Sequence, residues 1–395
     1  IVTQIHFFPA YFFVRATLLP HFCATVLSIF YPPFMAKKIY FTPGPSDIYF
    51  TVEEHLKNAL KEQIPAISHR SKRFQEIYAE AESNLRTLFG LPNDFHLAFT
   101  ASATEVWERL IQNCVEKEPF HFVNGSFSQR FYEIAGELGR TAKMAKADYG
   151  SYTPIGEVTI PASAELISVT QNETSTGVAF PQNEIEQLKA AYPNALIAVD
   201  FVSSAPVSNI DFGKIDTAYL SVQKCFGLPA GLGVWFYNDR CLERAKALQA
   251  KGQVIGSYHS LLKLHEGGLK KQTPETPNVL FIYLLGKVAG DMLTKGLDRI
   301  RIEAEYKATV LYTYFENHPL FAPFVKNAGA RSKTVIVAET GQHTAALIDF
   351  LKTKGMVVGS GYGPFKDSHI RVANFPTHSK ESIELLVDTI DTFKQ

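Results

Sequence analysis

The sequence predicts an α/β protein with a large domain built on a mostly parallel β-sheet and a smaller α+β domain at the C-terminal end. Two observations support this fold class. Between residues 95 and 237, short apolar runs with strand character alternate with helical segments, and turns follow the strands. Beyond residue 279, long helical patterns precede a few strands. The 395 residues, 46% hydrophobic and 20% charged, suffice for one large and one small domain.

The expected strands of the large domain are short and end in polar or glycine-rich turns. The run 195–200 is apolar until its last residue, which is typical of a buried parallel strand. Helices are expected to open near residue 101 and to cover 181–192. In open α/β sheets ligands bind beyond the carboxyl ends of the strands, so residues in those turns are candidates for a site. The expected strands are 95–100, 120–123, 165–169, 195–200, 216–222 and 234–237.

One lysine and one aspartate stand at the ends of two such strands. The run 216–222 is followed by Gln223 and Lys224, and then by a Gly/Pro-rich loop with few charges. Partial desolvation there would lower the pKa of the Lys224 amine toward its nucleophilic neutral form. The preceding strand ends in Asp200. The pair suits pyridoxal 5'-phosphate, which a lysine binds covalently while an aspartate pairs with the pyridinium nitrogen.

Together with the motifs described next, these residues resemble the class V aminotransferases, which are fold-type I pyridoxal-phosphate enzymes. The resemblance runs from about Lys38 to the C-terminus, and it includes similarity to the phosphoserine and alanine–glyoxylate (serine–pyruvate) aminotransferases. It implies a cofactor-binding large domain at 35–290, with a seven-stranded sheet between helices, and a small domain at 291–395. It further implies a transaminase acting on phosphoserine and 2-oxoglutarate, as in serine biosynthesis.

The resemblance also assigns cofactor contacts. Small and hydroxyl residues after the strand 95–100 open a helix, where backbone N–H groups bind anions, although an ordinary N-cap would look the same. An aromatic residue after a strand is commonly a core residue, and a polar turn is commonly a surface loop. The implied contacts are Ser102, Ala103 and Thr104 at the cofactor phosphate, Phe127 on the ring, Thr174 at the phenolic oxygen, and Gln223 beside Lys224.

Substrate contacts are implied by three further segments. The rigid Pro/Gly turn 40–46 lies on the substrate side in the family. His69 and Arg70 match an S-H-R segment that binds substrate phosphate, the alternative being a solvated helix start. Arg371 would bind the α-carboxylate as a bidentate pair. A second His-Arg pair expected before Arg371 is absent, and Lys366 is the one substitute. This departure keeps open a small unphosphorylated pair, alanine or serine with glyoxylate or pyruvate.

The segment 271–278 resembles a family loop that reaches the cofactor phosphate of the neighbouring subunit. Gln272 and Thr273 occupy the contacting positions. A proline-punctuated connector before the next helix is the alternative reading. The resemblance therefore implies a homodimer with shared active sites.

Residues 1–34 differ in composition from the rest of the chain. They are rich in Phe and Tyr, contain Arg15 as their one Lys or Arg residue, and contain no acid. We expect this segment to lie outside the native protein, with Met35 as the natural start. A membrane anchor or secretory signal is the alternative, but Pro20 divides the apolar run into stretches too short to cross a bilayer.

Charge and cysteine content exclude several other classes. The 39 basic and 39 acidic residues balance, so neither nucleic acid nor an anionic membrane is expected as a partner. The four cysteines show neither paired spacing nor a His/Cys cluster. They predict no disulfide framework and no metal site, and they favour a reducing, cytoplasmic location.

Two other functions are considered for this sequence. Ser221 and Lys224 match the S-x-x-K pattern of serine acyl-transfer enzymes. That motif should open a helix, whereas here it ends a strand, and its partner motifs are absent from the sequence. A non-catalytic binding protein with the same fold is the other rival, and the combination of Lys224 with Asp200 argues against it.

Overall fold

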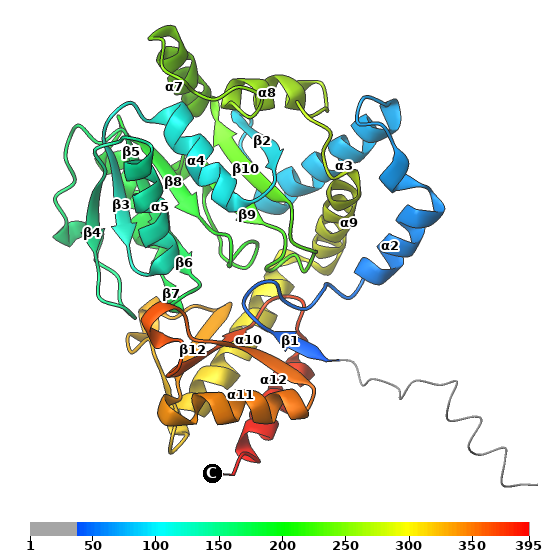
Figure 1. The fold of residues 1–395 in the computed structure, drawn as a ribbon, viewed down its shortest axis with the longest axis vertical. Helices are drawn as coiled ribbons and strands as arrows, with labels where there is room; N and C mark the ends of the chain where they lie inside the picture. The colour runs from blue at the N-terminus through cyan, green and yellow to red at the C-terminus, as the bar shows by residue number, and fades with distance from the viewer. Residues whose placement is uncertain (1–37, 395) are drawn as a thin grey trace, which may run out of the picture. The chain divides into compact units, whose positions relative to one another are not determined.

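The computed structural model describes residues 38–394, and its larger β-sheet has seven strands (Figure 1). The strand order is β2-β10-β9-β8-β5-β3-β4. All neighbouring strands are parallel except β10, which runs antiparallel to β2 and β9. The prediction of a mostly parallel seven-stranded sheet is confirmed. The strands are β2 (Phe95–Thr100), β3 (Pro119–Val123), β4 (Lys143–Lys146), β5 (Leu166–Thr170), β8 (Leu196–Asp200), β9 (Thr217–Ser221) and β10 (Gly233–Asn238).

The continuous apolar character of the central strands reflects burial on both faces of this sheet. In β8, Leu196 and Ala198 face one hydrophobic core, whereas Ile197 and Val199 face another. On the first side lie α4 (Ala103–Cys114), α5 (Ser126–Glu137), α7 (Asp239–Ala250) and α8 (Leu261–Leu269). On the second lie α2 (Val52–Lys61), α3 (Lys72–Phe89), α6 (Gln182–Ala191) and α9 (Val279–Lys295).

A second sheet of five strands belongs mainly to the C-terminal part of the chain. Its order is β1-β13-β14-β12-β11, with β1 parallel to β13. Strand β1 (Ile39–Phe41) precedes the large sheet in sequence, yet its Phe41 packs in the core of this smaller sheet. The other strands are β11 (Ala322–Pro323), β12 (Val335–Glu339), β13 (Met356–Ser360) and β14 (His369–Ala373). The helices packed on it are α10 (Leu297–Asn317), α11 (Thr344–Thr353) and α12 (Lys380–Asp391).

Several short elements complete the described part of the chain. The ribbon of β6 (Asn172–Glu173) and β7 (Val178–Ala179) follows β5 directly. Single 3-10 turns cover Ile64–Ala66, Ile155–Glu157, Phe212–Lys214, Ala328–Ala330, Gly341–His343 and Gly363–Phe365. Within residues 38–394, no helix is long and apolar enough to cross a membrane. The segment 1–34 lies outside the described residues.

Candidate active site

Lys224 lies just beyond β9 and is buried, with 9% of its surface exposed. Its Nζ atom donates a hydrogen bond of 2.6 Å to the carbonyl oxygen of Pro43, in the Pro/Gly turn that follows β1. Burial, reinforced by the positive charge of Arg371, lowers the pKa of the Lys224 ammonium to about 8. The amine is therefore much easier to deprotonate than an ordinary lysine, as the sequence predicts.

Asp200 is the last residue of β8 and is also buried. Its Oδ2 accepts a hydrogen bond of 3.2 Å from the indole N–H of Trp107, and its Oδ1 accepts one of 3.0 Å from the backbone N–H of Val202. Desolvation raises the pKa of this carboxyl to about 7, although both hydrogen bonds and the charge of Lys224 oppose the shift. The group is thus poised to share a proton near neutral pH.

Lys224 and Asp200 line the same cavity, which has a volume of about 110 Å³. This is the convergence that the sequence predicts for residues at the carboxyl ends of neighbouring strands. Five further predicted residues line this cavity, namely Ala103, Thr104, Phe127, Thr174 and Gln223. Their individual roles remain predictions.

The first turn of α4 forms one end of the cavity. Ser102 is its N-cap, and its Oγ accepts a hydrogen bond of 3.1 Å from the N–H of Glu105. The N–H of Ala103 donates to the Oγ of Ser221 at 2.9 Å, which ties the turn to the end of β9. The positive end of the helix dipole therefore faces the space between Thr104 and Lys224, where an anion would be stabilised.

Phe127 is oriented by a buried carboxylate that the sequence did not identify as functional. Glu173 is fully buried and accepts hydrogen bonds from the backbone N–H groups of Phe127 and Ser128 in the first turn of α5. It also accepts from the N–H and hydroxyl of Ser175. The Nζ atom of Lys224 lies 5.9 Å from the centroid of the Phe127 ring, so the ring forms one face of the space beside the amine.

Arg371 reaches the site from the smaller sheet. It lies on β14, and its guanidinium donates to the carbonyl oxygens of Ser360 at 2.8 Å and Thr174 at 3.3 Å. The ring of Tyr362 lies 5.2 Å from the guanidinium carbon and 5.3 Å from the Phe127 ring, centroid to centroid. A cation is thus held beside the Lys224 cavity, as the resemblance implied for a carboxylate-binding arginine.

The remaining predicted binding residues lie outside the Lys224 cavity. Arg70, Gln272 and Thr273 line a separate cavity, and a guanidinium N–H of Arg70 donates to Gln272 Oε1 at 2.8 Å. Burial and the charge of Arg70 lower the pKa of the adjacent His69. Within the described residues, none of these four lines the Lys224 cavity, and neither does the exposed Lys366.

The Lys224 cavity has the donor set that pyridoxal 5'-phosphate requires. An amine, a carboxyl, an aromatic face and a helix N-terminus converge there. Gln223 Oε1, which also lines it, is buried and has no hydrogen-bond partner within residues 38–394. Residues 38–394 contain no grouping of three His, Cys, Asp or Glu side chains that could hold a metal ion.

Sequence reasoning missed three parts of this site. The indole of Trp107 acts on the site through its hydrogen bond to Asp200, and the carboxylate of Glu173 acts through the first turn of α5. The third part is the backbone carbonyl of Pro43, which accepts a hydrogen bond from Lys224. Glu173 directly precedes Thr174, to which the resemblance assigned a cofactor contact, so an acid beside a predicted site residue was the available signal. The packing of Trp107 against Asp200 leaves no local pattern in the sequence.

Comparison with known proteins gives a consistent result. The family model described as Aminotransferase class-V matches residues 42–369. The crystal structure of a phosphoserine aminotransferase from Cytophaga hutchinsonii is 52% identical, with a TM-score of 0.88, over 90% of this chain and 98% of that chain. Phosphoserine aminotransferase from Rhodococcus opacus is 29% identical over 82% of this chain and 87% of its own length. An aspartate aminotransferase from Thermus thermophilus, 23% identical with a TM-score of 0.76 over 89% of this chain and 97% of that chain, shares the fold.

Proposed function

The chain belongs to the class V aminotransferases, and from this premise we propose that it transfers the amino group of phosphoserine to 2-oxoglutarate. Its cofactor is pyridoxal 5'-phosphate. The observation that carries the proposal is the convergence of Lys224, Asp200 and Phe127 on one buried cavity. The choice of phosphoserine rests on the relative with 52% identity over 90% of the chain.

When bound, the cofactor supplies an electron sink for the substrate α-carbon. Lys224 would hold it covalently through Nζ and, once released, would move the proton at the substrate α-carbon. The lowered pKa of Lys224 favours both roles, because each requires the neutral amine. Asp200 would face the ring nitrogen and hold a proton there, since an ionised carboxylate stabilises the protonated ring.

Two other groups would position the anionic parts of the ligands. The first turn of α4, at Ser102, Ala103 and Thr104, would bind the cofactor phosphate through backbone N–H groups and the helix dipole. Arg371 would bind the substrate α-carboxylate, since a guanidinium matches a carboxylate with two parallel hydrogen bonds.

We further propose a cytoplasmic homodimer in which each subunit completes the other's site. Arg70 hydrogen-bonds Gln272, so a loop that carries Gln272 and Thr273 to a partner would carry Arg70 with it. Beside this loop Leu269 is 66% exposed, and on α2 Leu60 is 60% exposed, which suits an apolar interface. His69 and Arg70 would then bind the substrate phosphate in the partner's site.

The substrate is tested by assaying purified holoenzyme with two substrate pairs. We expect turnover of phosphoserine with 2-oxoglutarate, and its loss in Lys224→Ala. Turnover of alanine or serine with glyoxylate, without activity toward phosphoserine, would replace the proposed substrate by the unphosphorylated alternative.

Shared sites are tested by complementation between two inactive variants. In a heterodimer of Lys224→Ala and Arg70→Gln chains, the Arg70→Gln chain keeps its own Lys224 and receives the intact Arg70 of the other chain. We therefore expect co-expression to restore activity at one of the two sites. Absence of any restoration in isolated heterodimers would show that Arg70 acts within its own chain.

A further inference from the structure

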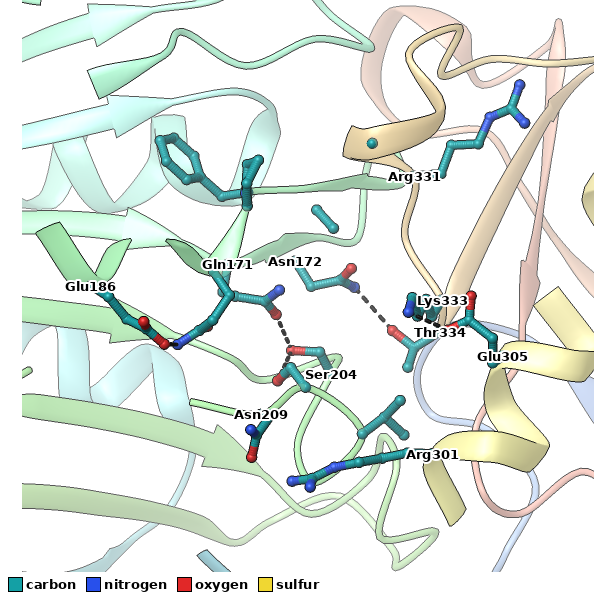
Figure 2. A pocket seen from close by; sticks show the side chains of 17 residues that line it. Gln171, Asn172, Glu186, Ser204, Asn209, Arg301, Glu305, Arg331, Lys333 and Thr334 are labelled. Atoms are coloured by element: carbon teal, nitrogen blue, oxygen red, sulfur yellow. Dashed lines mark hydrogen bonds and ion pairs between the residues drawn. The ribbon is translucent and has the colours of Figure 1, made fainter. Parts of the chain in front are cut away.

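A second, larger cavity of about 430 Å³ lies between the large sheet and the C-terminal part of the chain (Figure 2). The loops after β5 and β8 form one wall, and α10 with the residues before β12 forms the other. Its walls combine apolar surface with polar side chains, which include Gln171, Asn172, Ser204, Asn209, Arg301 and Thr334. A cavity of this size and polarity is suited to a small polar ligand.

One cation in this cavity lacks an adequate anion. Within residues 38–394, the buried Nε of Arg301 has no hydrogen-bond partner. A terminal nitrogen of its guanidinium lies 3.8 Å from the carboxylate of Asp298, which is almost fully exposed, whereas the Arg301 side chain is 29% exposed. By contrast, Arg331 pairs with Glu316 at 2.6 Å and Lys333 pairs with Glu305. Figure 2 shows the Arg301 side chain extending toward Asn209 along the cavity, whereas the guanidinium of Arg331 points away from it.

A buried acceptor in the same cavity lacks a donor. Gln182 Nε2 donates to Glu186 at 2.9 Å, but Gln182 Oε1 is buried without a hydrogen-bond partner in the described part of the chain. A buried amide oxygen without a donor costs free energy, and so does a buried guanidinium N–H without an acceptor. A ligand with one carboxylate and one O–H or N–H group carries both kinds of missing partner.

One residue joins this cavity to the Lys224 cavity. Asn172 lines both, and its Nδ2 donates to Ser203 Oγ at 2.7 Å and to Thr334 Oγ1 at 3.2 Å. Thr334 leads into β12, in which Val337 is paired with Arg371 of β14. A ligand that moves Thr334 relative to Asn172 would therefore move Arg371 relative to the rest of the site.

A second connection runs through the loop after β8. The hydroxyl of Ser204 donates to Gln171 Oε1, and the backbone N–H of Gln171 donates to the carbonyl oxygen of Asp200 at 2.8 Å. Figure 2 shows Gln171 and Ser204 joined at the centre of the cavity. Gln171, which lines the cavity, is thus one hydrogen bond away from the backbone of Asp200.

We propose that this cavity is an effector site for a small hydroxy acid or amino acid. The ligand's carboxylate pairs with Arg301, and its hydroxyl or ammonium group donates to Gln182 Oε1. Occupancy alters the catalytic site through Asn172 and Gln171. Binding at Arg301 is independent of the proposed function, whereas the effect on turnover rests on it.

The test titrates the holoenzyme with glycolate, which has a carboxylate and a hydroxyl but no amino group to transfer. Glycolate should bind at least about tenfold more weakly to Arg301→Met than to wild type, because a charge-assisted hydrogen bond is lost. Arg299→Met is the matched control, since Arg299 lies on the same helix, is 73% exposed and pairs with Glu303. Acetate, which lacks the hydroxyl donor, should bind more weakly than glycolate to wild type.

The variant Arg371→Met separates glycolate bound at Arg301 from glycolate bound at the catalytic arginine. This variant should still show the glycolate binding that depends on Arg301. Crystals soaked in glycolate should show it within hydrogen-bond distance of Arg301. In Arg371→Met, in which glycolate cannot pair with the catalytic arginine, glycolate should still change the visible absorption of the bound cofactor, and adding Arg301→Met to this variant should remove the change, whichever substrate the enzyme uses. Equal affinity in Arg301→Met and wild type would overturn the site, and binding at Arg301 without any spectral change would overturn the effector role.

Discussion

Replacement of Glu173 by Gln tests whether this buried carboxylate holds the α5 turn that carries Phe127. Its Oε2 accepts hydrogen bonds of 2.9 Å from the N–H and the hydroxyl of Ser128, and its Oε1 accepts from Phe127 and Ser175. In Glu173→Gln one oxygen becomes an NH₂ group, so in either amide orientation at least one backbone N–H faces another donor.

The expected cost follows from those contacts. A buried donor left without an acceptor costs about 1–3 kcal/mol, and loss of a negative charge at a helix N-terminus costs about 0.3–1 kcal/mol more. We therefore expect the free energy of unfolding of Glu173→Gln to fall by roughly 1–4 kcal/mol in urea titrations. Cofactor affinity should fall as well, because the Phe127 ring loses its fixed orientation.

The matched control is Glu137→Gln at the other end of the same helix. Glu137 is exposed and pairs with Arg130 on the surface, where an ion pair contributes little. A negative charge is also unfavourable near a helix C-terminus. Its unfolding free energy should therefore stay close to that of wild type. If Glu173→Gln is no less stable than Glu137→Gln, the positioning role of Glu173 is wrong.

Three further predictions concern the Lys224 cavity. Covalent attachment of the cofactor to the apoenzyme should accelerate as the pH rises through about 8, since only the neutral Lys224 amine reacts; a midpoint near 10.5, measured by absorption, would contradict the lowered pKa. Gly44→Ala should abolish attachment while the chain still folds, because φ is +131° there and a Cβ would overlap the Lys224 side chain; normal attachment rates would refute this. Trp107→Phe removes a donor that lowers the pKa of Asp200, so the pH dependence of cofactor affinity should shift upward, whereas Trp235→Phe, whose indole donates to a threonine, should leave it unchanged.

Much of the fold could be predicted because it has a local signal. Apolar runs such as Leu196–Asp200 alternate with amphipathic helices, and that alternation is typical of a parallel sheet covered on both faces. Strand β1 had no such signal, since its three residues join β13 across more than 300 positions of sequence. Strand β4 is also missing from the prediction, because Lys143 and Lys146 give this edge strand little apolar character.

The sequence by itself determined that Lys224 and Asp200 would meet, because parallel neighbouring strands bring their carboxyl ends to one edge of a sheet. Only the tertiary structure decided how these groups behave. Desolvation and the approach of Arg371 set the pKa of Lys224, and the packing of Trp107 sets the surroundings of Asp200. Such effects depend on which distant segments exclude water from a side chain, and burial of that kind is a property of packing rather than of any local pattern in the sequence.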